Sequence, residues 1–501
     1  MRAREMLQSS FRPSMEDDPA VVVNVSVDKT EDDADDLATG IQEEASNTEE
    51  AANANDELST AAESMSNLIE ALKDARKTGG LTPQSARFMR MSYESIVSPI
   101  GLQSSSRMLP AVESYDGQSA RISNTTVSIE EAESTLGKIW QGIKNFFLKA
   151  WNYLKNFFAK LFGGYEALSK SSKDLLAKAD KIGTKSAEGK IKTSAAGSLT
   201  VDGKFEPSKI AGRIGILEKA DGIVFNEYPN ALEQVFNSVS DAIPKVVDIA
   251  AANINQDRKE IIAAAGASGA SEPTKESMRV SNEDDTKDKE NVDAIKKQMA
   301  DLEAKLRADL EKVKAQFASV VGTFISKDFL GGYHFGIADI VNDGSVTSPF
   351  TFTKGPRENQ VAEGQELDAL SVNDIKAILN SVIAISDAGA KQKDVTARTK
   401  AAYDRLSGTM DSIMSKLDNK PGIVARLIIK FINRKIKATL LTPFSQFGSA
   451  SFVISRAAYG VCEKSIAAYT KEAAAAPTAA PTKTPAPSAE GLKITIGGRT
   501  Y

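Results

Sequence analysis

The chain has 501 residues, of which 41% are hydrophobic and only 6% aromatic, and its formal net charge is −5. A single cysteine, Cys462, and a single histidine, His334, exclude a disulfide framework and leave no Cys/His cluster for a structural zinc site. The length suffices for two or three domains, but so few apolar residues indicate that much of the chain is not packed.

Neither a targeting segment nor a membrane span is visible in the sequence. Residues 1–11 carry charges and no apolar run, which argues against a secretory signal. No stretch reaches the ~18 uninterrupted apolar residues of a spanning helix. We therefore expect the protein to be made and kept on the cytoplasmic side of its producing cell.

Charge is distributed unevenly along the chain. Residues 1–113 contain 10 Lys and Arg against 21 Asp and Glu, a net charge of −11. Residues 114–501 contain the remaining 52 against 46, a net charge of +6. An acidic leader in front of a mildly basic body indicates that the two parts have different partners or different fates.

The leader combines a polar stretch with a small helical hairpin. Residues 13–60 are too polar to offset their chain entropy by burial, so we expect disorder there, apart from a short strand at 21–23. Ser59 can begin a helix that ends before Gly79-Gly80. A second helix is expected before Pro99, with an apolar face that holds Phe88, Met91 and Tyr93.

An 11-residue sequence occurs twice in succession, as WQGIKNFFLKA and then WNYLKNFFAKL. Eleven residues are close to three α-helical turns, so the second copy extends the apolar face of the first. We expect this helix to end at Gly163-Gly164. The apolar face consists of Trp140, Ile143, Phe147, Trp151, Leu154, Phe158 and Leu161.

An aromatic face opposite a lysine-bearing face has two physical interpretations. The helix can lie at a membrane interface, with its rings at the acyl boundary and its lysines near anionic head groups. It can also pack its face against other helices of an all-α protein. The second interpretation is favoured, because amphipathicity is the ordinary signature of a packed helix.

The remainder of the chain is predicted to be mainly α-helical and elongated. We expect helices at 207–219, 229–240, 243–265, 295–324, 372–389, 391–418, 423–441 and 444–473, with irregular or hairpin segments at 183–206 and 328–366. Residues 423–441 form a second cationic amphipathic helix, which could meet phosphates, lipid head groups or acidic helices. The alternating C-terminal tail could pair as a strand with another chain.

These patterns suggest the following organisation. We expect an acidic leader at 1–113, a linker at 114–133, a helical region at 134–265, a polar linker at 266–293, a second helical region at 294–473, and an Ala/Pro-rich tether with the tail at 474–501.

No catalytic motif is found. The sequence contains no Walker loop, no GxGxxG after a strand, no GxSxG elbow, no HExxH pair and no Asp-rich calcium loop. His334 is far in sequence from Cys462, which argues against a catalytic Cys-His pair. A structural or assembly protein is therefore favoured over an enzyme, with no cofactor and no metal.

The first third of the chain resembles the internal head, or prohead core, proteins of large contractile-tailed bacteriophages, including giant phages of the phiKZ type. The resemblance lies in the acidic leader, the hairpin at 58–101, the sequence Ala111-Val112-Glu113 and the Trp/Phe/Lys helix. It implies a structural protein packed inside the capsid, which resides in the host cytoplasm before assembly. Its partners would be other core proteins and a prohead protease that removes an N-terminal propeptide after a glutamate in a small-X-Glu context.

Several glutamates fit that context, namely Glu63, Glu94, Glu113, Glu130, Glu188 and Glu490. Glu113 is favoured because it lies in a Ser/Gly/Asn-rich stretch and divides the −11 leader from the +6 body. Cleavage between Glu113 and Ser114 would leave a cationic body, which could associate weakly and without sequence specificity with packaged DNA. Glu94 and Glu130 are the nearest alternative sites.

Two other functions remain open at this point. One is a membrane-active effector or pore-forming protein, in which the helix from Trp140 to Leu161 acts on a membrane surface once the leader is removed. The other is a scaffold that is not processed at all.

Overall fold

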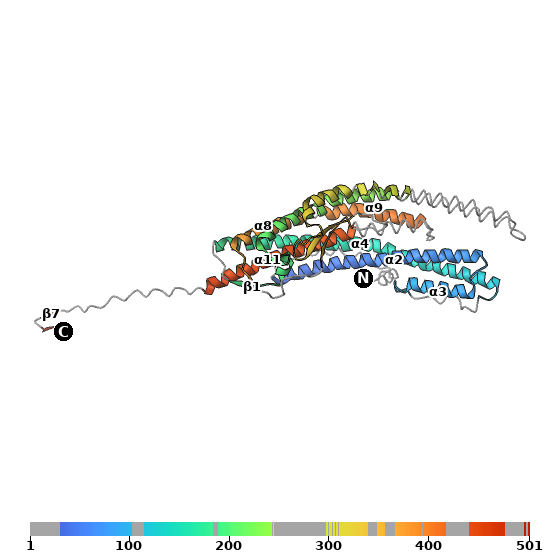
Figure 1. Cartoon of the computed structure of the whole chain (residues 1–501), viewed down its shortest axis with the longest axis horizontal. Coiled ribbons are helices and arrows are strands. Elements are labelled where there is room, and N and C mark those ends of the chain that lie inside the picture. The colour runs from blue at the N-terminus through green and yellow to red at the C-terminus, as the bar shows by residue number, and fades with distance from the viewer. Residues whose placement is uncertain are drawn as a thin grey trace.

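The molecule is an elongated, predominantly α-helical assembly, as the sequence predicts (Figure 1). The computed structural model describes residues 31–102, 115–183, 189–242, 244, 297–338 (without 299, 303, 306 and 309), 348–355, 366–416 (without 393), 440–475, 495–496 and 499–500. The expected strand at 21–23, the linker at 266–293 and the helix at 423–441 lie outside the described residues, as does almost all of the one at 243–265.

Long helices carry most of the described chain. They are α2 (Glu31–Lys77), α3 (Pro83–Val97), α4 (Gln118–Ile182), α5 (Pro207–Gly222), α8 (Val372–Lys391), α9 (Asp394–Lys416) and α11 (Thr442–Ala475). A π-helical turn, η3 (Ile223–Glu227), joins α5 to helical residues 228–242. The helix ending at residue 321 leads into the 3₁₀ turn η4 (Gly322–Phe324).

The strands among the described residues are short and form two-stranded antiparallel pairs. They are β1 (Lys190–Lys192) with β6 (Glu366–Asp368), β2 (Thr200–Val201) with β3 (Lys204–Phe205), β4 (Tyr333–Ile337) with β5 (Phe350–Lys354), and β7 (Thr495–Ile496) with β8 (Arg499–Thr500). The 3₁₀ helix η2 (Ser194–Leu199) precedes β2. The β4–β5 pair is a hairpin within the irregular segment predicted at 328–366. The two strands of the tail pair with each other.

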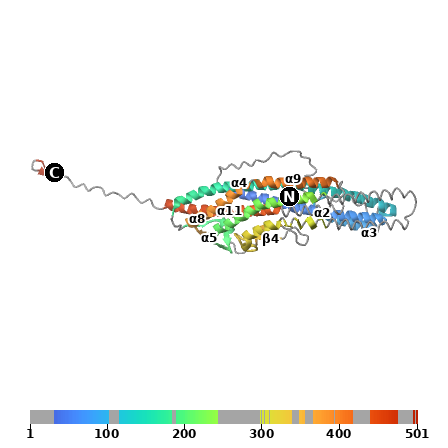
Figure 2. The same ribbon diagram turned by 90° about the horizontal axis from the view of Figure 1, so that it is seen from above.

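Helix α4 is the axis of the molecule. Its 65 residues extend over about 98 Å at 1.5 Å per residue. Helix α2 runs antiparallel to it, and α8, α9 and α11 also pack against it (Figures 1 and 2). Buried side chains of all these helices belong to one hydrophobic core. The helix begins at Gln118, so most of the linker expected at 114–133 is helical.

Helix α2 corrects the expectation of disorder for residues 31–60, whereas residues 13–30 lie outside the described residues. It begins at Glu31, and Ser59 lies in its interior, where its hydroxyl donates to the carbonyl of Asn55. Its buried residues follow a seven-residue repeat, which is the pattern of helices that pack side by side. One set of heptad positions holds Ile41, Thr48, Asn55, Ala62 and Ile69, and the other holds the half-buried Glu44 with Ala51, Leu58, Met65 and Leu72. Small side chains at these positions can be buried because α4 packs along the same face of α2.

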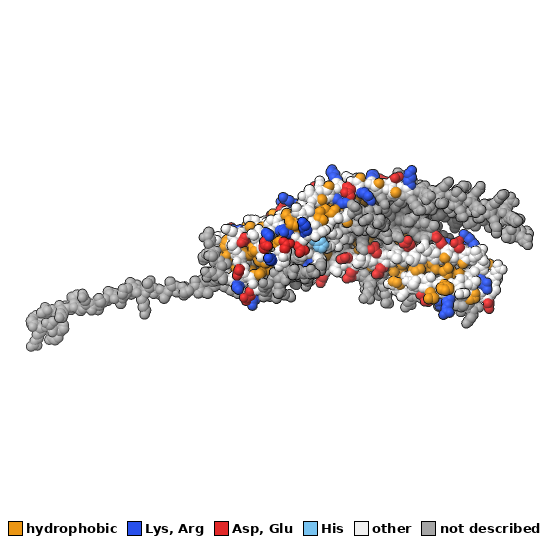
Figure 3. All heavy atoms as spheres, in the orientation of Figure 1, with side chains coloured by type: hydrophobic (Ala, Val, Ile, Leu, Met, Phe, Trp, Pro, Cys, Tyr) orange, Lys and Arg blue, Asp and Glu red, His pale blue; other side chains and the backbone are white. Residues whose placement is uncertain are grey.

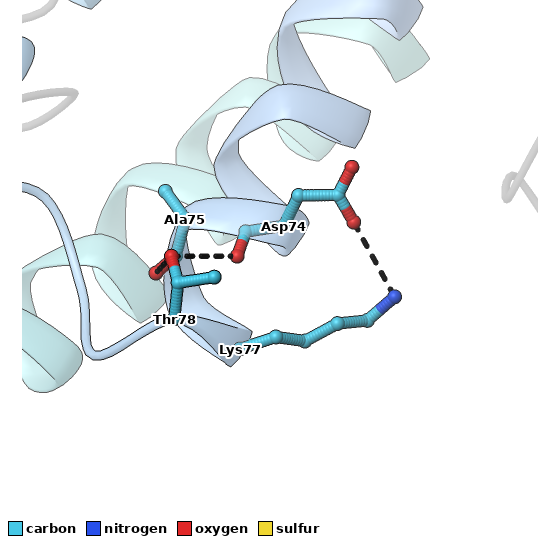
Figure 4. Close-up of polar contacts among 4 residues, drawn as sticks. All are labelled: Asp74, Ala75, Lys77 and Thr78. Atoms are coloured by element: carbon cyan, nitrogen blue, oxygen red, sulfur yellow. Dashed lines mark hydrogen bonds and ion pairs between the residues drawn. The ribbon is translucent and has the colours of Figure 1, made fainter. Parts of the chain in front are cut away.

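Helix α2 ends at Lys77, just before the glycine pair that was predicted to stop it (Figure 4). The hydroxyl of Thr78 donates to the carbonyl oxygens of Asp74 at 3.2 Å and Ala75 at 3.0 Å, which also accept from the backbone N–H groups of Thr78 and, for Ala75, of Gly80 at 2.8 Å. Lys77 forms an ion pair with Asp74 at 3.3 Å. Gly79 and Gly80 then adopt positive φ, which allows the chain to reverse into α3.

Helix α3 uses a different face from the one predicted. Thr82 caps its first turn by accepting from the backbone N–H of Ser85. Its buried side chains include Tyr93 and Val97, whereas Phe88 and Met91 are 64% and 62% exposed. Tyr93 turns its face of α3 toward α4, because its hydroxyl lies 3.0 Å from that of Thr135 on α4.

Residues 228–242 and α9 run side by side in the same direction. Arg398 donates to the amide oxygen of Asn230 at 3.1 Å, and seven residues further along each helix Arg405 donates to that of Asn237 at 2.8 Å. Arg405 also forms an ion pair with Asp241 at 2.7 Å. The repetition at the same spacing fixes the register between the two helices.

Glycines allow three helices to approach α4 or its neighbours closely. A Cβ atom at Gly164 of α4 would lie 2.8 Å from the ring of Phe452 and 3.2 Å from the Cδ1 atom of Ile41. Comparable overlaps would occur between Gly448 and Leu161 and between Gly389 and the ring of Tyr165. The prediction that Gly163-Gly164 ends the helix is therefore wrong, because Gly164 serves close packing in the middle of α4.

Replacement of Gly164 by alanine should destabilise the protein. Alanine is the better helix former by about 1 kcal/mol, but the forced overlap with Phe452 should cost about 1–3 kcal/mol and exceed that gain. Gly137→Ala is the matched control in the same helix, because nothing lies within 4 Å of its added Cβ, and this variant should be stabilised. Urea-unfolding midpoints measured by circular dichroism should move in opposite directions; equal shifts would contradict the packing role of Gly164.

Candidate functional site

The apolar face of the repeated sequence is buried between helices. Six of its seven side chains are described, and the most exposed, Trp151, is only 7% accessible; the others are Trp140, Ile143, Leu154, Phe158 and Leu161. The side chain of Phe147 lies outside the described residues. On the opposite face Gln141, Asn152, Lys155 and Asn156 are exposed. The face is thus directed into the molecule.

The second copy of the repeat is the centre of an aromatic cluster. The ring of Phe158 lies 5.3 Å from that of Phe444 and 6.4 Å from that of Phe225, measured between centroids, and both contacts are edge-on. Edge-on geometry is favourable because the positive rim of one ring meets the negative face of the other. Seven residues before Phe158 in the same helix, the ring of Trp151 lies 5.7 Å from that of Tyr403 of α9, measured between centroids. The repeat therefore joins α4 to η3, α9 and α11.

One polar side chain of the repeat also serves packing. Lys160 forms an ion pair with Glu44 of α2 at 2.8 Å, with side chains 27% and 15% exposed. Partial burial makes such a pair less screened by salt than a surface pair. The lysines of this helix are therefore not all available to a lipid or phosphate surface.

A buried carboxyl group connects three helices next to the aromatic cluster. Asp221 of α5 accepts hydrogen bonds from the hydroxyl of Tyr165 of α4 at 3.0 Å and from that of Ser451 of α11 at 2.9 Å. Both bonds reach its Oδ2 atom, and its Oδ1 atom is buried with no hydrogen-bond partner among the described residues. Burial raises the pKa of Asp221 to about 7, against the lowering effect of the two hydrogen bonds.

Asp221 is not among the residues predicted from the sequence, although the sequence contains a signal for it. Asp221 occupies the buried face of α5, at helical spacing after Ile210, Ile214 and Leu217. An acid at a position where the pattern requires an apolar residue is costly unless it is paired or protonated. The arrangement can hold a proton at near-neutral pH, and it carries no feature that would bind a substrate.

Stability should therefore fall as pH rises through the range in which Asp221 is protonated only in the folded state. Below about pH 4 the carboxyl is protonated in both states, whereas above about pH 7 it is ionised in both, and its charge must then be buried. The pKa of Asp221 is roughly three units higher in the folded than in the unfolded state, so the free energy of unfolding should fall by at most about 4 kcal/mol between these limits. The free energy of urea unfolding should be measured at several values of pH in this interval.

Variants separate Asp221 from the other titrating groups. Asp221→Asn keeps the shape of the side chain but cannot ionise, so it should lose this part of the pH dependence. Asp174→Asn, at an exposed position of α4, should retain the wild-type profile. Identical profiles for wild type and Asp221→Asn would show that Asp221 does not titrate in this range.

His334 and Cys462 lie on separate elements. His334 is in β4, with its Nε2 atom 3.3 Å from the hydroxyl of Thr353 on β5. Cys462 is fully buried in α11, where burial, followed by the nearby charge of Asp374, raises the pKa of its thiol well above the usual range. Its Sγ atom contacts the carbonyl oxygen of Ile375 at 3.9 Å. A reactive thiol requires the opposite shift of its pKa.

The predicted cleavage positions Glu113 and Ser114 lie outside the described residues, as do Glu188 and Glu490. The other three candidates lie in helices. Glu63 follows the buried Ala61 and Ala62 of α2, Glu94 follows the buried Tyr93 of α3, and Glu130 follows the buried Ser128 and Ile129 of α4. Glu94 and Glu130, the nearest alternatives to Glu113, thus lie in helices beside buried residues, where the backbone is less accessible to a protease.

Within the described ranges, no group of three or more His, Cys, Asp or Glu side chains is placed to hold a metal ion. None of the described helices combines the length and the apolar character needed to cross a bilayer.

The face seen in Figure 3 carries charges of both signs over much of its described surface, and hydrophobic side chains gather at the end where α3 lies. The large hydrophobic residues exposed in this part of the chain are Phe88 and Met91 of α3 and Ile122 and Val127 of α4. This surface was not predicted, because periodicity placed Phe88 and Met91 on the same apolar face as the buried Tyr93.

Together these features define an elongated α-helical structural protein whose distinctive side chains hold helices together. A model of the family described as phiKZ-like phage internal head proteins matches residues 25–464. The chain therefore belongs to this family, and the resemblance inferred from its first third is confirmed. No curated protein and no solved structure matches the chain. Membership places the protein in the interior of the virion capsid, in association with other capsid components.

Proposed function

We propose that the protein is a structural component of the capsid interior that enters the prohead as a precursor and is matured by a cut between Glu113 and Ser114. The observation that carries the structural role is the family match over residues 25–464. The burial of the repeat of α4 agrees with it, since this helix contributes to packing and not to chemistry.

The choice of Glu113 is supported by the positions of its competitors. Glu63, Glu94 and Glu130 have the right sequence context, but each lies in a helix with buried residues immediately before it. Glu113 lies between α3 and α4, and it also marks the boundary between the −11 leader and the +6 body. A prohead protease would be the partner in this step.

Removal of the leader would change the charge of the protein in the compartment that receives DNA. Separation of residues 1–113 changes the net charge from −5 to +6 on the remaining chain. A positive charge of this size supports a weak, salt-dependent attraction to the phosphate backbone without recognition of sequence.

A membrane-active function receives less support. The aromatic face from Trp140 to Leu161 would have to leave the core before it could reach a lipid surface, and Lys160 would have to give up its ion pair with Glu44. Dye leakage from vesicles caused by the intact 114–501 fragment would favour this function over a purely structural one.

Mass spectrometry of protein from mature particles tests the proposed cut. The particle-associated chain should begin at Ser114, and Glu113→Gln should leave a longer form, since the proposed cut requires a glutamate and glutamine lacks its carboxylate. Glu130→Gln is the matched control: it has the same small-X-Glu context but lies in α4, so processing should be unchanged. An intact chain beginning at Met1 or Arg2 in mature particles would refute the proposal.

A further inference from the structure

We infer that the leader stays bound to the body after the cut, because α2 and α3 form a docking unit for the surface of α4 and α11. The inference rests on the proposed cleavage after Glu113, but the contacts that carry it lie entirely among described residues. It assigns a partner to that surface, namely the leader itself as a separate chain.

The interface extends along most of α2. Its buried heptad positions from Ile41 to Leu72 face α4, which is the element that α2 contacts most, and α11 also contacts it. The close approach of Ile41 and Phe452 at Gly164 shows that α2, α4 and α11 meet at this end. An interface of this length with an apolar centre resembles those of obligate complexes and does not require a covalent link.

Specific polar contacts fix the register at both ends of the interface. Glu44 pairs with Lys160 near the start of α2, and Lys73 pairs with Glu133 at 2.8 Å near its end. These pairs place the two helices antiparallel.

The turn into α3 and α3 itself add further contacts with α4. The backbone N–H of Leu81 donates to the hydroxyl of Thr125 at 2.8 Å, and the hydroxyl of Tyr93 lies 3.0 Å from that of Thr135. A Cβ atom at Gly80 would lie 2.5 Å from the backbone of Arg121, so the turn fits closely against the start of α4. None of these contacts depends on the peptide bond after Glu113.

Charge favours the same outcome. The separated parts would carry net charges of −11 and +6, so their attraction opposes dissociation. While the leader remains docked, the complex keeps the charge of the intact chain, −5. The shift to a cationic body, and with it any attraction to DNA, would therefore follow dissociation of the leader and not the cut.

The experiment cuts the folded full-length protein at a chosen place. A recognition sequence for a site-specific laboratory protease is inserted between Gln103 and Val112, the protein is cut to completion, and the product is analysed by size-exclusion chromatography with light scattering. We expect one peak with the mass of both fragments, in low and in high salt. Separate peaks for the two fragments under native conditions would overturn the inference.

Paired variants identify the contacts responsible. Leu72→Asp places a charge at a buried heptad position and should weaken retention of the leader at least about tenfold, since burial of an unpaired carboxylate costs more than 1.4 kcal/mol. Ala71→Asp makes the same change at the adjacent exposed position and should retain the leader as the wild type does. Equal retention by both would contradict docking through the heptad face.

A charge exchange keeps the test informative if Leu72→Asp does not fold. Glu44→Lys and Lys160→Glu should each release the leader at lower urea concentration, and the double variant should restore retention. Absence of restoration would contradict the assigned register. Because the cut is made by a laboratory protease, these results do not depend on whether Glu113 is the natural site, which the mass of the particle protein decides.

Discussion

The structure depends on the antiparallel packing of α2 along α4. This contact joins the acidic part of the chain to the basic part, and it supplies one side of the core from Ile41 to Leu72. A helix of 47 residues with a low content of large apolar side chains gains little stability on its own. Packing against α4 stabilises α2. Without α2, one apolar face of α4 would be exposed to solvent.

The sequence predicted the class of fold and several elements well. The helical spacing of apolar residues and the turn signals located the helices expected at 372–389, 391–418 and 444–473. Ser371 caps α8, where its hydroxyl accepts from the backbone N–H of Asp374. These predictions were sound because the signals are local. The 11-residue repeat likewise identified the aromatic face, since Trp and Phe at helical spacing form one continuous apolar stripe that must be buried.

The errors arose where tertiary contacts override local preference. Residues 31–60 were expected to be disordered because Ala, Thr and Asn occupy the heptad positions that large apolar residues usually hold, although the seven-residue spacing was present. Gly164 was interpreted as a stop signal, but the close ring of Phe452 accounts for it. Phe88 and Met91 were grouped with Tyr93 on one apolar face, because hydrophobicity alone cannot tell which face of a short helix meets its neighbour.

The acidic composition of the leader and its helical packing are compatible because they use different faces of α2. Glu43, Glu49, Glu50 and Glu57 are exposed, so their charges remain solvated while the heptad positions are buried. Net charge is thus a property of the surface and does not report whether a segment is folded. Net charge does not report the effect of Asp221 either. This one buried carboxyl makes the stability of the protein depend on pH, although it is one of 67 acidic residues that face 62 basic ones. Under the proposed cut, the net charge presented to a neighbouring phosphate would depend on whether α2 stays packed on α4, so one contact would govern both the fold and that charge.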